Sequence, residues 1–219
     1  MKAKYTWMAI LICLGVLGSS VAVMAQGHKV ARNHISITQT SSVEHTPQGP
    51  PVALHVPSSA EKYFSDVELI NQDGKKVRFY SDVLKDKVVI INTFFTTCTS
   101  VCPPLNRNFE KIQQALGDRL GKAAFLVSIS VDPETDTPER LKEYGRRFHA
   151  REGWTFLTGK KANVEAALYK LGQYVEKKDE HSTIIIIGNE PKGLWKKALG
   201  LAKSEELMKI VVDVMNDKM

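Results

Sequence analysis

The sequence lacks a strong charge imbalance and any basic cluster. Its 30 Lys and Arg residues stand against 24 Asp and Glu residues, a net charge of +6, and the two signs are interleaved along the chain. A nucleic-acid-binding protein typically carries a basic stripe or patch. We therefore predict no nucleic-acid partner.

Cysteine is scarce, with three in 219 residues. Cys13 lies in a long apolar segment, and Ile12 before it is too large for a lipid-attachment site. Only Cys98 and Cys102 remain for the rest of the chain. An even pair in an oxidising compartment ordinarily predicts a structural disulfide.

Charge is absent from Tyr5 to Gly27, directly after two lysines. The pattern is typical of a secretory signal peptide with cleavage after Ala25. The run is also long enough to cross a bilayer, so an uncleaved anchor in the inner membrane is the alternative. Both readings place the remaining chain in the periplasm or another extracytoplasmic space, soluble or anchored.

Apolar periodicity is missing from the next segment, which is rich in Ser, Thr, Pro, Gln and His. We predict three parts: a signal peptide or membrane anchor at 1–25, a flexible linker at 26–60 and a folded domain at 61–219. Four of the six histidines fall in the linker, and their irregular spacing fits no metal-ligand template.

The domain alternates short apolar runs with amphipathic segments. "VELINQDGKKVRFY" predicts a hairpin around Asp73-Gly74. "KVVIINTFF", "AAFLVSISV" and "STIIIIGN" predict buried strands, and segments of helical period lie between them. We predict an α/β fold with a central mixed sheet flanked by helices and an N-terminal β-hairpin extension. "SEELMKIVVDVM" predicts a last helix capped near Ser204.

The stretch "FFTTCTSVCPPL" places Cys98 and Cys102 where a buried strand ends and a helix begins. Proline is tolerated in the first turn of a helix, so both cysteines are expected at its amino end, where the dipole favours thiolates. Thiolates suit a redox pair and a metal site equally. The four-residue spacing favours a metal. On a helix the Cβ atoms of such a pair lie about 5–6 Å apart, whereas a disulfide needs about 3.5–4.5 Å and a bridging metal ion does not.

A third metal ligand would have to be a domain histidine, and there are two. His149 lies near the end of a predicted helix, where an imidazole usually has a structural role. His181 lies at the start of a buried strand. Asp132, in "SISVDPETDTPERLKEY", follows another strand and is a candidate to orient a metal ligand by a hydrogen bond without binding the metal itself. Asp136 or Thr137 in the same motif is expected to cap a helix.

These motifs resemble the SCO/SenC family of thioredoxin-like copper proteins. The resemblance covers about residues 63–215 and rests on the cysteine motif with its strand, on "SISVDPETDTPERLKEY", on "GWTFLTG" and on "EHSTIIIIG". It implies a thioredoxin-like fold in which Cys98, Cys102 and His181 bind copper. A site with two thiolates favours soft ions, copper(I) before others, and copper(II) is the alternative. It also implies delivery of copper to, or maintenance of the thiols of, the copper-accepting subunit of a respiratory cytochrome oxidase.

One difference from many members is that Thr99 and Ser100 replace a Pro and an Asp. Losing a carboxylate beside the thiolates favours their charged form and weakens the attraction for a cation.

Three other functions stay open. One is a thiol–disulfide oxidoreductase that uses Cys98 and Cys102 on thiol partners without a metal, although the usual Cys-x-x-Cys is absent. The others are a peroxidase, which lacks its expected proline at Phe95, and a docking module built on the lysines of "PKGLWKKALG".

Overall fold

The computed structural model describes residues 59–216, so the predicted leader at 1–25 and most of the predicted linker at 26–60 lie outside the described residues. Within 59–216, no helix is long and apolar enough to span a bilayer. Seven strands in this range form one sheet in the order β2-β1-β5-β4-β3-β6-β7. The strands are β1 (Glu68–Asn71), β2 (Lys76–Arg78), β3 (Val88–Phe94), β4 (Phe125–Ser130), β5 (Trp154–Thr158), β6 (Ile184–Asn189) and β7 (Leu194–Leu199).

The sheet is mixed, as predicted. Strands β3, β4 and β5 run parallel at its centre, where apolar and β-branched residues are buried on both faces. The predicted hairpin β1–β2 extends the sheet by pairing antiparallel with β5. On the other side β6 pairs antiparallel with β3, and β7 closes that edge.

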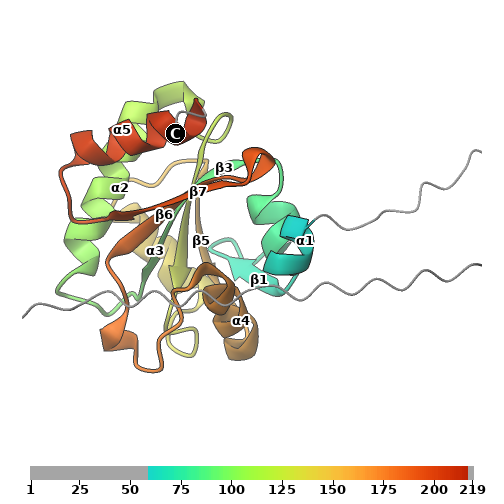
Figure 1. The fold of residues 1–219 in the computed structure, drawn as a ribbon. Helices are drawn as coiled ribbons and strands as arrows, with labels where there is room; N and C mark the ends of the chain where they lie inside the picture. The colour runs from blue at the N-terminus through green and yellow to red at the C-terminus, as the bar shows by residue number, and fades with distance from the viewer. Residues whose placement is uncertain (1–58, 217–219) are drawn as a thin grey trace, which may run out of the picture. The chain divides into compact units, whose positions relative to one another are not determined.

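Helices cover both faces of the sheet (Figure 1). Aromatic and aliphatic side chains of α2, α3 and α5 pack on one face, and those of α1, η1 and α4 pack on the other. The helical elements are α1 (Ser59–Phe64), η1 (Phe79–Leu84), α2 (Cys102–Leu116), η2 (Gly117–Arg119), α3 (Pro138–Arg146), α4 (Lys161–Leu171), η3 (Lys178–Glu180), η4 (Glu190–Lys192) and α5 (Ser204–Met215). Two hydrophobic clusters, one on each face, hold the sheet between them.

The structure differs from the sequence-based expectations in three local details. The lysine-rich segment "PKGLWKKALG", for which no strand was predicted, contains the edge strand β7, in which Trp195 packs against Phe64 with ring centroids 5.0 Å apart. Residues 59–60, assigned to the linker, begin helix α1. Ser204 does not cap α5, because Lys203 is the cap residue and the Ser204 hydroxyl bonds the neighbouring Glu205 instead.

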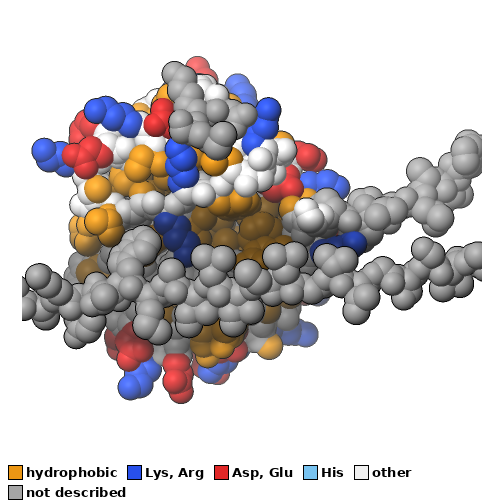
Figure 2. Space-filling model, viewed as in Figure 1, with side chains coloured by type: hydrophobic (Ala, Val, Ile, Leu, Met, Phe, Trp, Pro, Cys, Tyr) orange, Lys and Arg blue, Asp and Glu red, His pale blue; other side chains and the backbone are white. Residues whose placement is uncertain are grey.

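The surface carries mixed charge. In the view of Figure 2, Lys and Arg side chains lie beside Asp and Glu side chains around the rim of the described part of the face. Hydrophobic side chains gather in a hollow near the centre of that view, where a groove of about 660 Å³ lies between α1, α4 and β7. Tyr63, Tyr169 and Trp195 line this groove. It lies on the sheet face opposite α2, so it is separate from the cysteines.

Candidate metal centre

The two cysteines lie at the carboxyl end of β3, as predicted. The chain turns immediately after the strand, and the backbone N–H of Cys98 donates to the carbonyl of Phe95 at 3.1 Å. Helix α2 then begins at Cys102, with prolines at its first positions. Apolar residues at helical spacing hold α2 against the sheet, including Leu105 and Phe109, which are fully buried. The end of β3 and the start of α2 thus place both sulfur atoms at the carboxyl ends of the central strands.

The pKa values of the two thiols are shifted in opposite directions. Burial raises the pKa of Cys98, but hydrogen bonds from Cys102 and from the backbone outweigh it and leave the pKa below its ordinary value. One of these bonds joins the Cys102 N–H to Cys98 Sγ at 3.4 Å. Cys102 is fully buried, and desolvation raises its pKa far above the ordinary value. The expectation that the helix dipole favours both thiolates is therefore wrong for Cys102, because burial dominates there.

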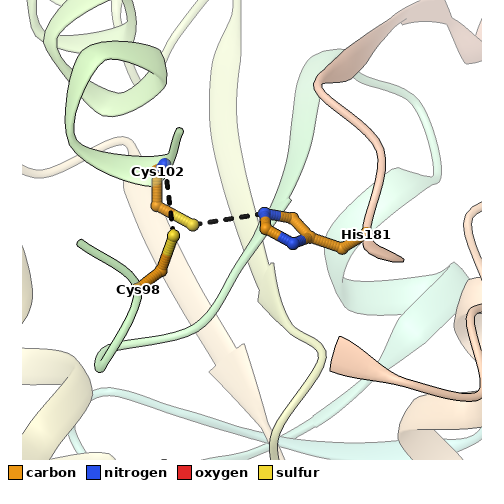
Figure 3. Close-up of side chains that lie close together, drawn as sticks. All are labelled: Cys98, Cys102 and His181. Atoms are coloured by element: carbon orange, nitrogen blue, oxygen red, sulfur yellow. Dashed lines mark hydrogen bonds between the residues drawn. The ribbon is translucent and has the colours of Figure 1, made fainter. Parts of the chain in front are cut away.

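His181 reaches the same point from the segment before β6. Its Nδ1 lies 2.8 Å from the carbonyl oxygen of Lys178, and a carbonyl can only accept, so Nδ1 carries the proton. Its Nε2 then faces Cys102 Sγ at 3.2 Å with a free lone pair (Figure 3). Burial lowers the pKa of the imidazole. At neutral pH the ring is therefore uncharged, with the ligating nitrogen turned towards the sulfur atoms.

The sulfur atoms of Cys98 and Cys102 and a ring nitrogen of His181 all lie within 4.8 Å of one another, and all three residues are buried. These three atoms could together hold one metal ion, because thiolate sulfur and imidazole nitrogen are common metal ligands. Two thiolates and an imidazole form a soft donor set. The fold thus brings together residues that are up to 83 positions apart in the sequence.

Asp132 does not touch these three residues. Its carboxylate accepts a hydrogen bond from Lys178 Nζ at 2.7 Å, with 12% of the Asp132 side chain exposed. Asp132 therefore reaches the site through Lys178, whose carbonyl bonds His181. Asp132 was predicted to contact a ligand directly, whereas in the structure Lys178 lies between Asp132 and His181.

Asp136 is a residue whose role the sequence did not reveal. It is fully buried, and its carboxylate accepts hydrogen bonds from the Thr96 N–H at 3.1 Å, the Thr96 hydroxyl at 2.5 Å and the Ser130 hydroxyl at 2.6 Å. The helix cap beside it is Thr137, whose side chain accepts from the N–H of Arg140. Asp136 instead fixes the loop that leads to the cysteines.

A buried polar chain behind α2 was also missed. The Trp154 Nε1–H donates to the Ser128 hydroxyl at 3.0 Å, and that hydroxyl donates to Asn92 Oδ1 at 2.6 Å. The Asn92 amide donates to Asn106 at 3.0 Å, and the Asn106 amide donates to the Cys102 carbonyl at 3.1 Å. An Asn within an apolar strand was the available signal. The chain fixes the first turn of α2 relative to the sheet.

The second domain histidine takes no part in the site. His149 follows the end of α3, and its Nδ1 pairs with a carboxylate oxygen of Glu110 at 2.7 Å. Its side chain is 78% exposed. The expected structural role of His149 is consistent with this contact.

The central mixed sheet, the covering helices and the cysteine-bearing helix start define a thioredoxin-like domain with a buried Cys-Cys-His group. The chain matches the SCO1/SenC family over residues 56–216 and belongs to that family.

Curated relatives agree with this assignment. The SCO1 protein homolog of Bacillus subtilis is 33% identical over 118 residues, which are 53% of this chain and 60% of the relative. A SCO2-like protein of Rickettsia conorii is 36% identical over 105 residues, 48% of each chain. The present chain thus spans about half of the length of these curated relatives.

Solved structures cover the domain more fully. A SCO1/SenC family lipoprotein from Bacillus anthracis is 28% identical, with a TM-score of 0.58 over 67% of this chain and 91% of that one. Bradyrhizobium japonicum ScoI, solved with copper bound, is 26% identical with a TM-score of 0.56 over 68% of this chain and 96% of that one. BsSco, described as a cytochrome c oxidase assembly protein with a disulfide switch, is 26% identical with a TM-score of 0.57 over 70% and 93%.

Proposed function

We propose that this protein is an extracytoplasmic copper-binding protein that delivers copper to, or maintains the thiols of, the copper site of a respiratory cytochrome oxidase. The observation that carries the proposal is that the ligand atoms of Cys98, Cys102 and His181, all three buried, lie within 4.8 Å of one another. The copper-bound ScoI structure and the oxidase-assembly role stated for BsSco support it. The export pattern of residues 1–25 supports the compartment.

The donor set fits copper(I) as the cargo. Thiolates select copper(I) over harder ions, and a neutral imidazole adds a third ligand without adding charge. Cys98 is the cysteine that deprotonates more readily, so it is the natural first ligand. Cys102 must lose its proton when the metal binds, and the neutral His181 Nε2 beside it at 3.2 Å is placed to accept a hydrogen bond from the thiol beforehand.

A second candidate function is thiol–disulfide exchange without a metal. The unequal thiols favour it: Cys98 has a lowered pKa and can attack, while Cys102 is held protonated by burial. In that reaction the pair would pass two electrons and two protons to a partner disulfide and become a disulfide itself. The same oxidation would remove two copper ligands, so the two functions are coupled. We expect copper binding to vanish on mild oxidation and to return with reductant.

A strain that lacks this protein tests the cellular role. We expect its cytochrome oxidase activity to fall and to return with the wild-type gene, but not with His181→Ala. The exposed His149→Ala is the matched control and should restore activity fully. Rescue by added copper would indicate delivery, whereas rescue by added thiol reductant alone would indicate thiol maintenance. Full rescue by His181→Ala would contradict the copper function and favour the metal-free exchange.

A further inference from the structure

We propose that Lys178 is a positioning residue for His181, and that its ion pair with Asp132 holds the histidine in ligating position. The proposal rests on the proposed copper site, because its consequence is a change in metal affinity. It also gives a role to Asp132, the first aspartate of the "VDPETD" motif, which bonds Lys178 and contacts none of the three ligands.

One backbone group positions the imidazole. The Lys178 carbonyl oxygen accepts from the His181 backbone N–H at 3.2 Å and from His181 Nδ1 at 2.8 Å. These two bonds set the place of the residue and the direction of its ring, which points Nε2 at Cys102 Sγ. Any displacement of Lys178 would therefore be passed on directly to the ligating nitrogen.

The side chain of Lys178 fixes that backbone group to the sheet. Its ammonium donates to Asp132 Oδ2 at 2.7 Å, at the carboxyl end of β4, and lies 5.2 Å from the centre of the Phe95 ring. The Phe95 ring in turn meets the imidazole of His181 edge to face, with centroids 5.3 Å apart. Lys178 thus links the segment between α4 and β6 to the loop that carries the cysteines. The segment has only the short turn η3 as regular structure of its own.

Charge and position predict opposite effects when Lys178 is replaced. A nearby ammonium repels a metal cation, so its removal alone should tighten copper binding. Loss of the tether should weaken copper binding, because groups that orient metal ligands typically contribute about 10-fold to 100-fold in affinity. The direction of the change in Lys178→Met therefore separates a positioning role from a simple charge effect. Methionine retains an apolar stem that can cover Phe95.

Lys177→Met is the matched control. It lies one residue away, removes the same charge, and breaks only an exposed contact of 4.0 Å with Glu180. We expect copper(I) affinity, measured by chelator competition on the purified reduced protein, to fall about tenfold in Lys178→Met, at the lower end of the range for ligand-orienting groups. Lys177→Met should stay within about twofold of wild type, and Lys178→Arg should recover most of the affinity. Urea unfolding of each variant verifies folding.

A metal-free readout makes the test independent of copper. In apo protein, long-range ¹H–¹⁵N NMR should show His181 as a single tautomer with its proton on Nδ1, and this signal should broaden or split in Lys178→Met but not in Lys177→Met. An unchanged signal in Lys178→Met, or copper binding as tight as in wild type, would overturn the proposal. If wild type fails to bind copper while the tautomer is still lost in Lys178→Met, the positioning role stands and the copper function fails.

Discussion

Asp136 should be among the most sensitive positions in the domain, although it contacts neither a ligand nor solvent. The change to examine is Asp136→Asn, which keeps the shape of the side chain and removes its charge. The carboxylate now receives bonds from the N–H and hydroxyl of Thr96 and from the Ser130 hydroxyl. An asparagine amide has only one acceptor oxygen, and its NH₂ group would face one of these donors.

The expected cost follows from the number of donors left without a partner. Hydrogen bonds to a charged group contribute about 1.5–3 kcal/mol each, and they are not additive, so we expect a loss of about 3 kcal/mol in the free energy of unfolding. For a domain of this size each kcal/mol lowers Tm by about 2–4 °C, which gives a fall of about 6–12 °C. Because Thr96 lies two residues before Cys98, the cysteine loop should also loosen.

Urea unfolding of the reduced protein measures this loss. The control is Asp73→Asn, which breaks an exposed ion pair with Lys142 and should change stability by less than about 0.5 kcal/mol. The change should appear in the urea midpoint with an unchanged slope. A loss below about 1 kcal/mol for Asp136→Asn would refute the argument that the buried carboxylate organises this loop.

Three further predictions follow from other sites. Gly188→Ala should destabilise the protein by about 1–3 kcal/mol in urea unfolding, because the added methyl group would lie 2.2 Å from the indole ring of Trp195. A variant as stable as wild type would contradict this. Side-chain and backbone bonds from Arg78 lower the pKa of Asp82 to about 2, so its stabilisation is complete above the unfolded pKa near 4 and is lost as pH falls to about 2. In Asp82→Asn, the free energy of unfolding should therefore fall less between about pH 4 and about pH 2 than in wild type. Identical pH profiles of stability for the two proteins would contradict this contribution from Asp82. Iodoacetamide should label Cys98 before Cys102, as peptide mass mapping would show; the reverse order would be inconsistent with the pKa difference.

Much of the fold could be predicted from the sequence because its strands are strongly apolar. The runs that became β3, β4 and β6 are too short and too β-branched for helices. The edge strand β7 was missed because Lys196 and Lys197 interrupt its apolar pattern. An edge strand with solvent on one side tolerates such residues, and lysine is common there.

The site was predictable only in part. The spacing of Cys98 and Cys102 indicated chemistry at a strand end. His181 was one of two candidate histidines, and the resemblance to a known fold, rather than any local feature, placed it beside the cysteines. Asp136 was hidden by the helix-cap signal of its neighbour Thr137. Lys178 could not be found, because a lysine in a charged loop carries no sign of which carboxylate it will meet after folding.

An anaerobic copper(I) titration of the reduced protein, compared with His181→Ala and His149→Ala, tests the central claim most directly. We expect one tight equivalent for wild type and for His149→Ala, and an affinity at least tenfold weaker for His181→Ala, a difference of about 1.4 kcal/mol. Absence of tight binding in wild type, or equal affinity in His181→Ala, would contradict a three-ligand copper site built from Cys98, Cys102 and His181.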